Sequence, residues 1–269
     1  MFQNVAVRFG QGHRAFAAQN NYKYKRTVIP MKASIQLWSL NRVIPEIGLI
    51  NALKLVSGHG YSGVEFAGFG GISAKDMAAA LKENGLYSVG SHTGIDLFRD
   101  ALRENLEYNK EIGSEYMIIP GTATDTADEV KALAELLNRS AETAKEYGIK
   151  IGYHNHAHEF KKIDGRYALN LLADEISDDV VLEIDAFWVA YAGENPYEYI
   201  KKAGAKAELI HFKQIAADGK SNVRLPDGVI DFKKLAADSK YAKHFVVEQE
   251  DESDQTESSK INMEYLRKL

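Results

Sequence analysis

Short apolar runs alternate with longer segments of helical period from residue 33 to the end of the chain. Buried parallel strands are continuous runs of Val, Ile and Leu, whereas covering helices repeat their apolar positions every three or four residues. The alternation therefore predicts strand–helix units and a parallel sheet. We expect eight strands, at residues 33–38, 63–66, 87–92, 116–119, 150–154, 180–184, 209–212 and 245–248.

The segments between these strands favour a closed barrel. Residues 74–83 and 127–147 have helical character, and Gly85 and Gly148 stand where C-terminal caps are expected. Loops after the strands are rich in glycine and polar residues (FAGFGG, HTGID, PGTATD), whereas the turns before the strands are short. A protein whose function lies at one face of a barrel has this asymmetry. The predicted fold class is α/β, a single-domain (β/α)8 TIM barrel.

Length and composition set the domain boundaries. The 269 residues, 45% hydrophobic and 26% charged, suit one large α/β barrel, which we place at residues 31–269. Residues 1–30 are too polar and irregular for a core, so we expect an irregular or disordered N-terminal extension. They also lack the apolar stretch of a secretory signal, and no window approaches the roughly 20 apolar residues of a membrane span. We therefore expect a cytoplasmic protein with no membrane partner.

Charge and cysteine content narrow the chemistry. The chain has no cysteine, so a metal site would use oxygen and nitrogen ligands. A formal net charge of -5 provides no general basic field for a phosphate backbone, so nucleic acid is not expected as a partner. The few arginines near strand ends are scattered, which favours an unphosphorylated small-molecule substrate. Oligomeric state is left open, and a homo-oligomer is compatible with the sequence.

Metal-ligand residue types recur where the last four predicted strands end. The carboxyl ends of barrel strands meet at one mouth, so side chains far apart in sequence can surround one divalent ion there. An isolated strand-end carboxylate is more often a helix N-cap or a salt-bridge partner, but the conjunction favours a metal site. The residues are His154, His156 and Glu159 in IGYHNHAHEF, Asp185 in VVLEID, His211 in ELIHFK and Glu248 in HFVVEQE.

Five segments in a fixed order carry a family resemblance: IGYHNHAHEF, LEIDAFWVAYAGENP, HFKQ, LPDGVIDF and VVEQED. In this order and spacing, residues 33–269 resemble the sugar phosphate isomerase/epimerase family within the xylose isomerase-like TIM barrels. The resemblance implies one divalent cation held by four side chains from strands five to eight. It also implies carbohydrate or inositol-type substrates. The family includes isomerases, epimerases, dehydratases and lyases, so the reaction stays open.

Carried over residue by residue, the resemblance implies Asp185, His211 and Glu248 as three metal ligands. The fourth ligand is open between Glu159 and His154, because many relatives have Glu-Asn-His where this chain has His-Asn-His. With Glu159, three carboxylates and one imidazole suit Mn²⁺, Mg²⁺, Co²⁺ or Zn²⁺. With His154, the set is more zinc-like.

The chemistry expected at such a site is proton removal next to a carbonyl. A metal that chelates the carbonyl and hydroxyl oxygens of a keto-sugar, sugar acid or keto-inositol makes the neighbouring C–H acidic. Glu159 and Glu248 are the candidate bases. Returning the proton gives isomerisation or epimerisation, whereas losing a β-hydroxyl or glycosyl group gives elimination, with His154 or His156 as a general acid that titrates near neutral pH.

Other residues are expected to line the substrate pocket. Lys213, two positions after the strand-seven histidine, points to the same side of its strand and can bind an oxyanion. Glu65 and His92 end strands two and three on the same rim. Trp38 and Trp188 can form an apolar wall against the C–H faces of a sugar.

Two other function classes occur on the same kind of barrel. Endonucleases that act at abasic DNA sites share the barrel but need additional histidine ligands. Here the third residue after Asp185 is Trp188, and SNVRLPDG lacks the required Asp-x-His, so this class is disfavoured. A non-catalytic sugar-binding barrel stays open, because fold alone does not establish activity.

Overall fold

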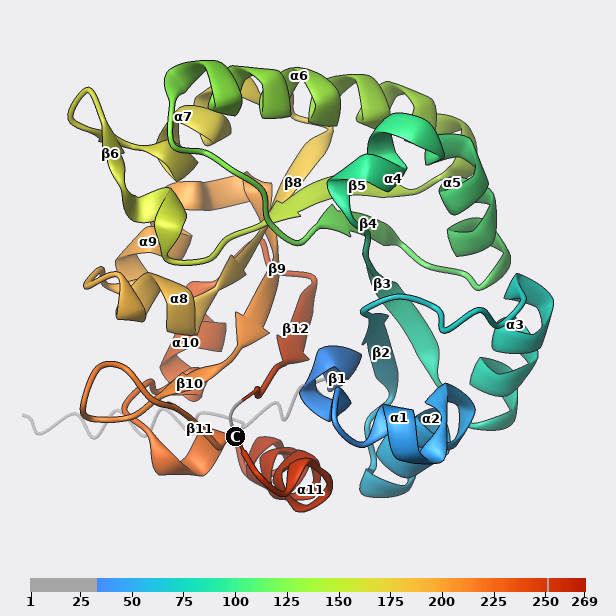
Figure 1. The fold of residues 1–269 in the computed structure, drawn as a ribbon. Coiled ribbons are helices and arrows are strands. Elements are labelled where there is room, and N and C mark those ends of the chain that lie inside the picture. Colours follow the sequence, from blue (N-terminus) through green and yellow to red (C-terminus); the bar gives the residue numbers. More distant parts are fainter. Residues whose placement is uncertain (1–32, 251) are drawn as a thin grey trace, which may run out of the picture. The chain divides into compact units, whose positions relative to one another are not determined.

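Eight parallel strands close into a barrel in the computed structural model, which describes residues 33–250 and 252–269 (Figure 1). The first and last strands pair with each other, Ser34 opposite Val246, so the barrel has no free edge. The predicted TIM barrel is confirmed. In chain order the barrel strands are β1 (Ser34–Gln36), β2 (Gly63–Phe66), β3 (Tyr87–His92), β4 (Tyr116–Ile119), β5 (Lys150–His154), β8 (Val180–Asp185), β9 (Ala207–Phe212) and β12 (His244–Val247).

Helices surround the barrel in Figure 1. The α-helices are α1 (Ile44–Ile47), α2 (Leu49–His59), α3 (Ala74–Glu83), α4 (Ile95–Asp100), α5 (Leu102–Glu111), α6 (Ala127–Ala144), α7 (Ala168–Glu175), α8 (Ala186–Tyr191), α9 (Pro196–Ala203), α10 (Phe232–Asp238) and α11 (Gln255–Leu266). Short 3-10 turns are η1 (Leu37–Leu40), η2 (Lys145–Tyr147), η3 (His158–Phe160), η4 (Gly204–Lys206) and η5 (Leu225–Asp227). Two hairpins pair β6 (Lys162–Ile163) with β7 (Arg166–Tyr167) and β10 (Gln214–Ile215) with β11 (Asn222–Val223).

Local chemistry explains where elements differ from their predicted bounds. The first strand is shorter than expected, because the Gln36 side chain accepts a hydrogen bond from Trp38 N and starts η1. The helix predicted at 127–147 is α6 followed by η2, and Gly148 ends it in the left-handed conformation that glycine favours. At its other end, Thr126 and Glu129 form a capping box.

The barrel interior changes from apolar to charged toward the carboxyl ends of its strands. Val181, Leu209 and Val246 belong to one buried apolar cluster. Side chains two positions further along each strand point to the same face, which places Glu183, His211 and Glu248 in the next layer. The interior is also tightly packed, because a Cβ atom at Gly152 would lie 2.5 Å from Ile118 Cδ1.

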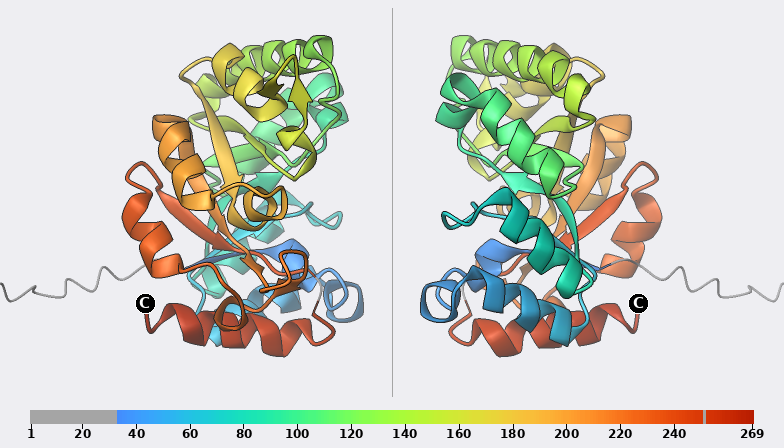
Figure 2. Two further views of the ribbon diagram at one scale, coloured as in Figure 1. Left: turned by 90° about the vertical axis from the view of Figure 1, so that its left-hand side faces the viewer. Right: turned by 90° about the vertical axis from the view of Figure 1, so that its right-hand side faces the viewer.

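The C-terminal helix α11 packs against α2, and the two run side by side in both views of Figure 2. Tyr61 OH donates to Ser259 O at 2.9 Å, and Arg267 donates to the carbonyl of His59. These bonds tie the end of the chain to its first strand–helix unit. Within the described ranges, no helix combines the length and apolar character needed to cross a bilayer. The extension expected at residues 1–30 lies outside the described residues.

Candidate metal centre

Four side chains from four strands meet at the mouth of the barrel. His154 ends β5, Asp185 ends β8, His211 lies on β9 and Glu248 directly follows β12. One donor atom from each lies within 4.8 Å of the others, and all four residues are buried. Asp185, His211 and Glu248, which come together as expected, are thus joined by His154 rather than by Glu159.

The distances within this group fit one shared cation. Asp185 Oδ2 lies 3.5 Å from His154 Nε2 and 3.8 Å from His211 Nδ1. His211 Nδ1 lies 3.1 Å from Glu248 Oε2. Two ligands that each bind an ion at about 2.1 Å lie roughly 3 to 3.5 Å apart at tetrahedral or octahedral angles. The group therefore needs only small adjustments to coordinate a divalent ion.

Two donor atoms in the group are buried without a hydrogen-bond partner among the described residues. They are His154 Nε2 and Asp185 Oδ2, and they face each other. A buried polar atom without a hydrogen-bond partner costs free energy, so such an atom indicates a site for a water molecule or an ion. The two imidazoles and two carboxylates suit Zn²⁺, Mn²⁺ or Co²⁺. The residues present thus fit a divalent metal.

Charges in the group are strongly coupled. Burial by itself would raise the pKa of Glu248, but Lys213 and His211 outweigh it and hold this pKa well below the usual range. Burial would lower the pKa of His211, yet Glu183, Glu248 and Glu65 raise it well above its ordinary value. A metal that binds His211 Nδ1 must therefore displace a proton.

Lys213 is completely buried beside the group, as its spacing from His211 predicts. Its Nζ lies 3.3 Å from Glu248 Oε2 and 3.9 Å from Asp185 Oδ2, and it also contacts Glu250. Burial lowers the pKa of a lysine, but these carboxylates reverse the shift and raise it. The ammonium group therefore stays charged and lies 4.9 Å from the centre of the Trp188 ring.

Of the two candidates for the fourth ligand, His154 lies within the group of Asp185, His211 and Glu248, and Glu159 lies outside it. Its Oε1 accepts a hydrogen bond from Tyr153 OH at 2.6 Å, and its Oε2 accepts one from His156 N at 2.9 Å. Glu159 is grouped instead with His156 and the half-exposed His158. The carboxylate thereby fixes the loop after β5, and both its oxygens are occupied.

His156 differs from the expected general acid. Burial, followed by the neighbouring His154, lowers the pKa of His156 to about 3, so the ring is neutral near pH 7. A neutral imidazole holds one donor and one acceptor but has no imidazolium proton to deliver. His156 Nδ1 and Trp188 Nε1 are both buried without partners within the described ranges, and their rings lie 5.2 Å apart.

A second group lies on the side of His211 that faces away from the candidate metal centre. It consists of Glu65, His92, Glu183 and His211. The sequence placed Glu65 and His92 at the rim but missed Glu183, which looked like an interior residue of the run VVLEID. Strand alternation from Asp185 would have found it, because residues two apart share a face. Burial and the negative charge of Glu183 raise the pKa of Glu65.

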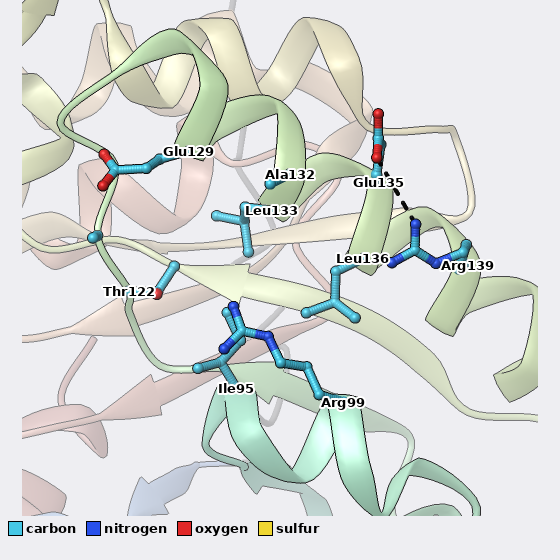
Figure 3. Close-up of a pocket in the computed structure, with 10 residues that line it drawn as sticks. Ile95, Arg99, Thr122, Glu129, Ala132, Leu133, Glu135, Leu136 and Arg139 are labelled. Carbon is cyan, nitrogen blue, oxygen red and sulfur yellow. Dashed lines mark ion pairs between the residues drawn. The ribbon is translucent and has the colours of Figure 1, made fainter.

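The remaining predicted pocket residue, Trp38, lies in η1 just after β1, and 49% of its surface is exposed. A separate cavity of about 400 Å³ lies between α4 and α6 (Figure 3). Arg99, Leu133 and Arg139 are among the residues that line it. None of its lining residues belongs to either buried group. This cavity is therefore distinct from the metal centre.

The chain belongs to the xylose isomerase-like TIM barrel family, whose family model matches residues 53–269. A curated relative, inosose dehydratase from Clostridium perfringens, is 29% identical over 154 residues, which cover 49% of this chain and 51% of that protein. Inosose dehydratase from Clostridium beijerinckii is 34% identical over 92 residues, which cover 34% of this chain and 30% of that protein. The chain thus spans about half or less of the length of these relatives.

Solved structures agree with the fold. A sugar phosphate isomerase/epimerase from Parabacteroides distasonis has a TM-score of 0.77 and 22% identity, covering 90% of this chain and 95% of that chain. The structure of an IOLI protein with a bound zinc atom has a TM-score of 0.69 and 17% identity, covering 88% of this chain and 96% of that chain. Likeness at these identities shows the shared barrel.

Proposed function

We propose that this protein is a divalent-metal-dependent enzyme of the isomerase/epimerase type. Its substrate is a keto-sugar, sugar acid or keto-inositol, from which it removes a proton next to the carbonyl. The observation that carries this proposal is the buried group of His154, Asp185, His211 and Glu248, four donors from four strands within 4.8 Å. Zinc in the similarly folded IOLI protein supports the choice of a divalent ion.

The metal, when bound, supplies a Lewis acid that polarises the carbonyl and stabilises the negative charge on its oxygen. Lys213 lies beside Glu248 and keeps its positive charge in a buried position. An ammonium in this place adds a fixed positive charge for the developing oxyanion. It also offsets part of the negative charge of Asp185 and Glu248.

Glu248 is the base in this proposal. The pKa of Glu248 lies well below its usual range, so the side chain is a carboxylate at neutral pH. Glu159 is a weaker choice, because hydrogen bonds to Tyr153 OH and His156 N occupy both of its oxygens.

Trp188 and the neutral His156 are proposed to bind substrate hydroxyls. Trp188 Nε1 is a donor and His156 Nδ1 is a donor or an acceptor according to tautomer, and both are buried without partners within the described ranges. A site built from such groups favours hydroxyl-rich substrates, because an apolar substrate leaves the groups unpaired.

Elimination of water is a second candidate outcome. The curated relatives named above are inosose dehydratases, with 29% and 34% identity over their matched segments. Removal of the proton next to the carbonyl is common to elimination, isomerisation and epimerisation. The outcomes differ in whether the proton returns or a β-hydroxyl leaves.

The test incubates the purified chain, stripped with a chelator and reloaded with Mn²⁺, Co²⁺ or Zn²⁺, with keto-sugars and keto-inositols in D₂O. We expect nuclear magnetic resonance to show deuterium next to the carbonyl, and dehydration would add an ultraviolet band from a conjugated enone. Asp185→Asn should lower the rate at least about 100-fold while the barrel stays folded by circular dichroism. Exchange that is independent of metal, or equal in the variant, would refute the proposal.

A further inference from the structure

The two ring nitrogens of His211 face two different groups. Nδ1 points to the metal centre, 3.1 Å from Glu248 Oε2 and 3.8 Å from Asp185 Oδ2. Nε2 points the other way: it is hydrogen-bonded to Glu65 Oε2 at 2.9 Å and lies 3.2 Å from Glu183 Oε1, an ion-pair contact without a hydrogen bond. A carboxylate can only accept hydrogen bonds, so Nε2 must carry a hydrogen to bond with Glu65. When a metal displaces the proton on Nδ1, a hydrogen held on Nε2 leaves the Nδ1 lone pair for the ion.

Further buried contacts hold these two carboxylates in place. Gln36 Nε2 donates to Glu65 Oε2 at 2.8 Å, and His92 Nε2 lies 2.7 Å from Glu183 Oε2. Gln36, Glu65, Glu183 and His211 are all 0% exposed. Water cannot compete for bonds in such a site, so the carboxylates keep a fixed orientation. The network joins β1, β2, β3, β8 and β9 across the barrel.

We infer that Glu183 and Glu65 are positioning residues that fix the orientation and tautomer of the metal ligand His211. This inference rests on the proposed metal-dependent function. A carboxylate that accepts the second N–H of a ligating histidine orients the ring and increases its basicity toward the metal. Neither carboxylate needs to touch the ion or the substrate for this role.

Two other roles predict different results. A purely structural pair would affect the stability of the barrel but not its affinity for metal. A second cation held by Glu65, His92 and Glu183, whose donor atoms also lie close together, would give two ions per chain. Metal affinity and stoichiometry therefore separate the three roles.

The experiment measures Co²⁺ and Zn²⁺ binding to the full chain and to Glu65→Gln by isothermal titration calorimetry. Glutamine keeps the size of the side chain, but its amide can donate to His211 Nε2 and so favour the tautomer that has hydrogen on Nδ1. We expect one ion per wild-type chain and roughly 10- to 100-fold weaker binding in the variant. The visible absorption of bound Co²⁺ should also change, because it reports the ligand geometry directly.

Glu208→Gln is the matched control. Glu208 is a buried carboxylate on the same strand as His211, but it is bonded to Lys150 and Lys243 at the other end of the barrel. This variant should lose stability and keep wild-type metal affinity. If Glu65→Gln does not fold by circular dichroism, Glu183→Gln takes its place with the same readouts.

The outcomes are distinct. A wild-type chain that binds one ion, with unchanged affinity in the folded variant, overturns the positioning role and leaves the proposed function standing. Two ions in the wild type and one in the variant overturn it in favour of a second cation site. A wild-type chain that binds no ion overturns both the positioning role and the proposed function.

Discussion

Asp185 is both a helix N-cap and a member of the proposed metal group, two roles that the sequence analysis treats as alternatives. Its Oδ1 accepts a hydrogen bond from Trp188 N at 3.1 Å and so caps the N-terminus of α8. Its Oδ2 has no hydrogen-bond partner among the described residues and faces His154 Nε2. The cap therefore fixes the direction in which the free oxygen points. At the scale of single residues, ordinary helix capping orients an atom of the metal centre.

Trp188→Phe tests the proposed hydroxyl recognition at this scale. The ring is kept, but the buried Nε1–H is lost, so a substrate hydroxyl loses one hydrogen-bond donor. We expect KM to rise about three- to tenfold with little change in kcat, since one hydrogen bond contributes about 0.5 to 1.5 kcal/mol. Steady-state kinetics measure this, and Tyr191→Phe, an exposed neighbour on the same helix, should behave as wild type. An unchanged KM in Trp188→Phe would contradict the role.

The strand β9 carries side chains with different chemistry at its two ends. His211 lies near the carboxyl end in the metal centre, whereas Glu208 lies near the amino end. Glu208 is held by Lys150 Nζ at 2.6 Å, Lys243 Nζ at 3.0 Å and Tyr116 OH at 2.9 Å. Substitution of Glu208 should therefore change the stability of the barrel, whereas substitution of His211 should change metal binding and activity.

Acid titration of stability tests this separation. Burial would raise the pKa of Glu208, but Lys150, Lys243 and Tyr116 outweigh it and lower the pKa. A lowered pKa in the folded state adds stability that is present above the unfolded value of about 4.3 and is lost as pH falls through the folded value. We expect Glu208→Gln to cost about 2 kcal/mol at pH 7.

The difference between wild type and Glu208→Gln should shrink as the pH falls below about 4.3. Denaturant unfolding of both proteins at pH 7 and at several acidic values provides the measurement. A difference that stays constant over this range would show that the lysine partners do not stabilise the charged carboxylate.

In the whole molecule, barrel closure brings the proposed metal ligands together. His154 and Glu248 are separated by 94 positions in the numbering, yet their donor atoms share one group. A preformed group of this kind does not exist in the unfolded chain, so metal binding should stabilise the folded state.

Metal removal tests this linkage. A free ion at 100 times its Kd adds about 2.7 kcal/mol to the free energy of unfolding. In a domain of this size that corresponds to a rise in Tm of roughly 5 to 10 °C. Calorimetry with added Zn²⁺ or with a chelator should show the shift in wild type, and Asp185→Asn should show none. Equal shifts in both proteins would place the ion elsewhere.

Local patterns in the chain are enough to predict the barrel, which the structure confirms, and three of the four proposed metal ligands. Apolar runs alternating with helical segments predict eight strand–helix units, and the structure has them. Asp185, His211 and Glu248 were identifiable because the carboxyl ends of parallel strands meet at one mouth. Local periodicity is enough for such statements, since it fixes which face and which end of a strand a side chain occupies.

The folded protein is needed to see which residue lies beside the other three proposed ligands and which side chains surround them. His154 and Glu159 are five residues apart, and spacing alone does not tell which one reaches Asp185. The fold turns Glu159 toward Tyr153 OH and leaves His154 Nε2 facing Asp185. Alternation along the strand places Glu183 on the same face as Asp185, but its contacts with His92 and His211 on other strands become visible only in the fold. Distances across a barrel depend on closure and packing, which no local pattern in the chain encodes.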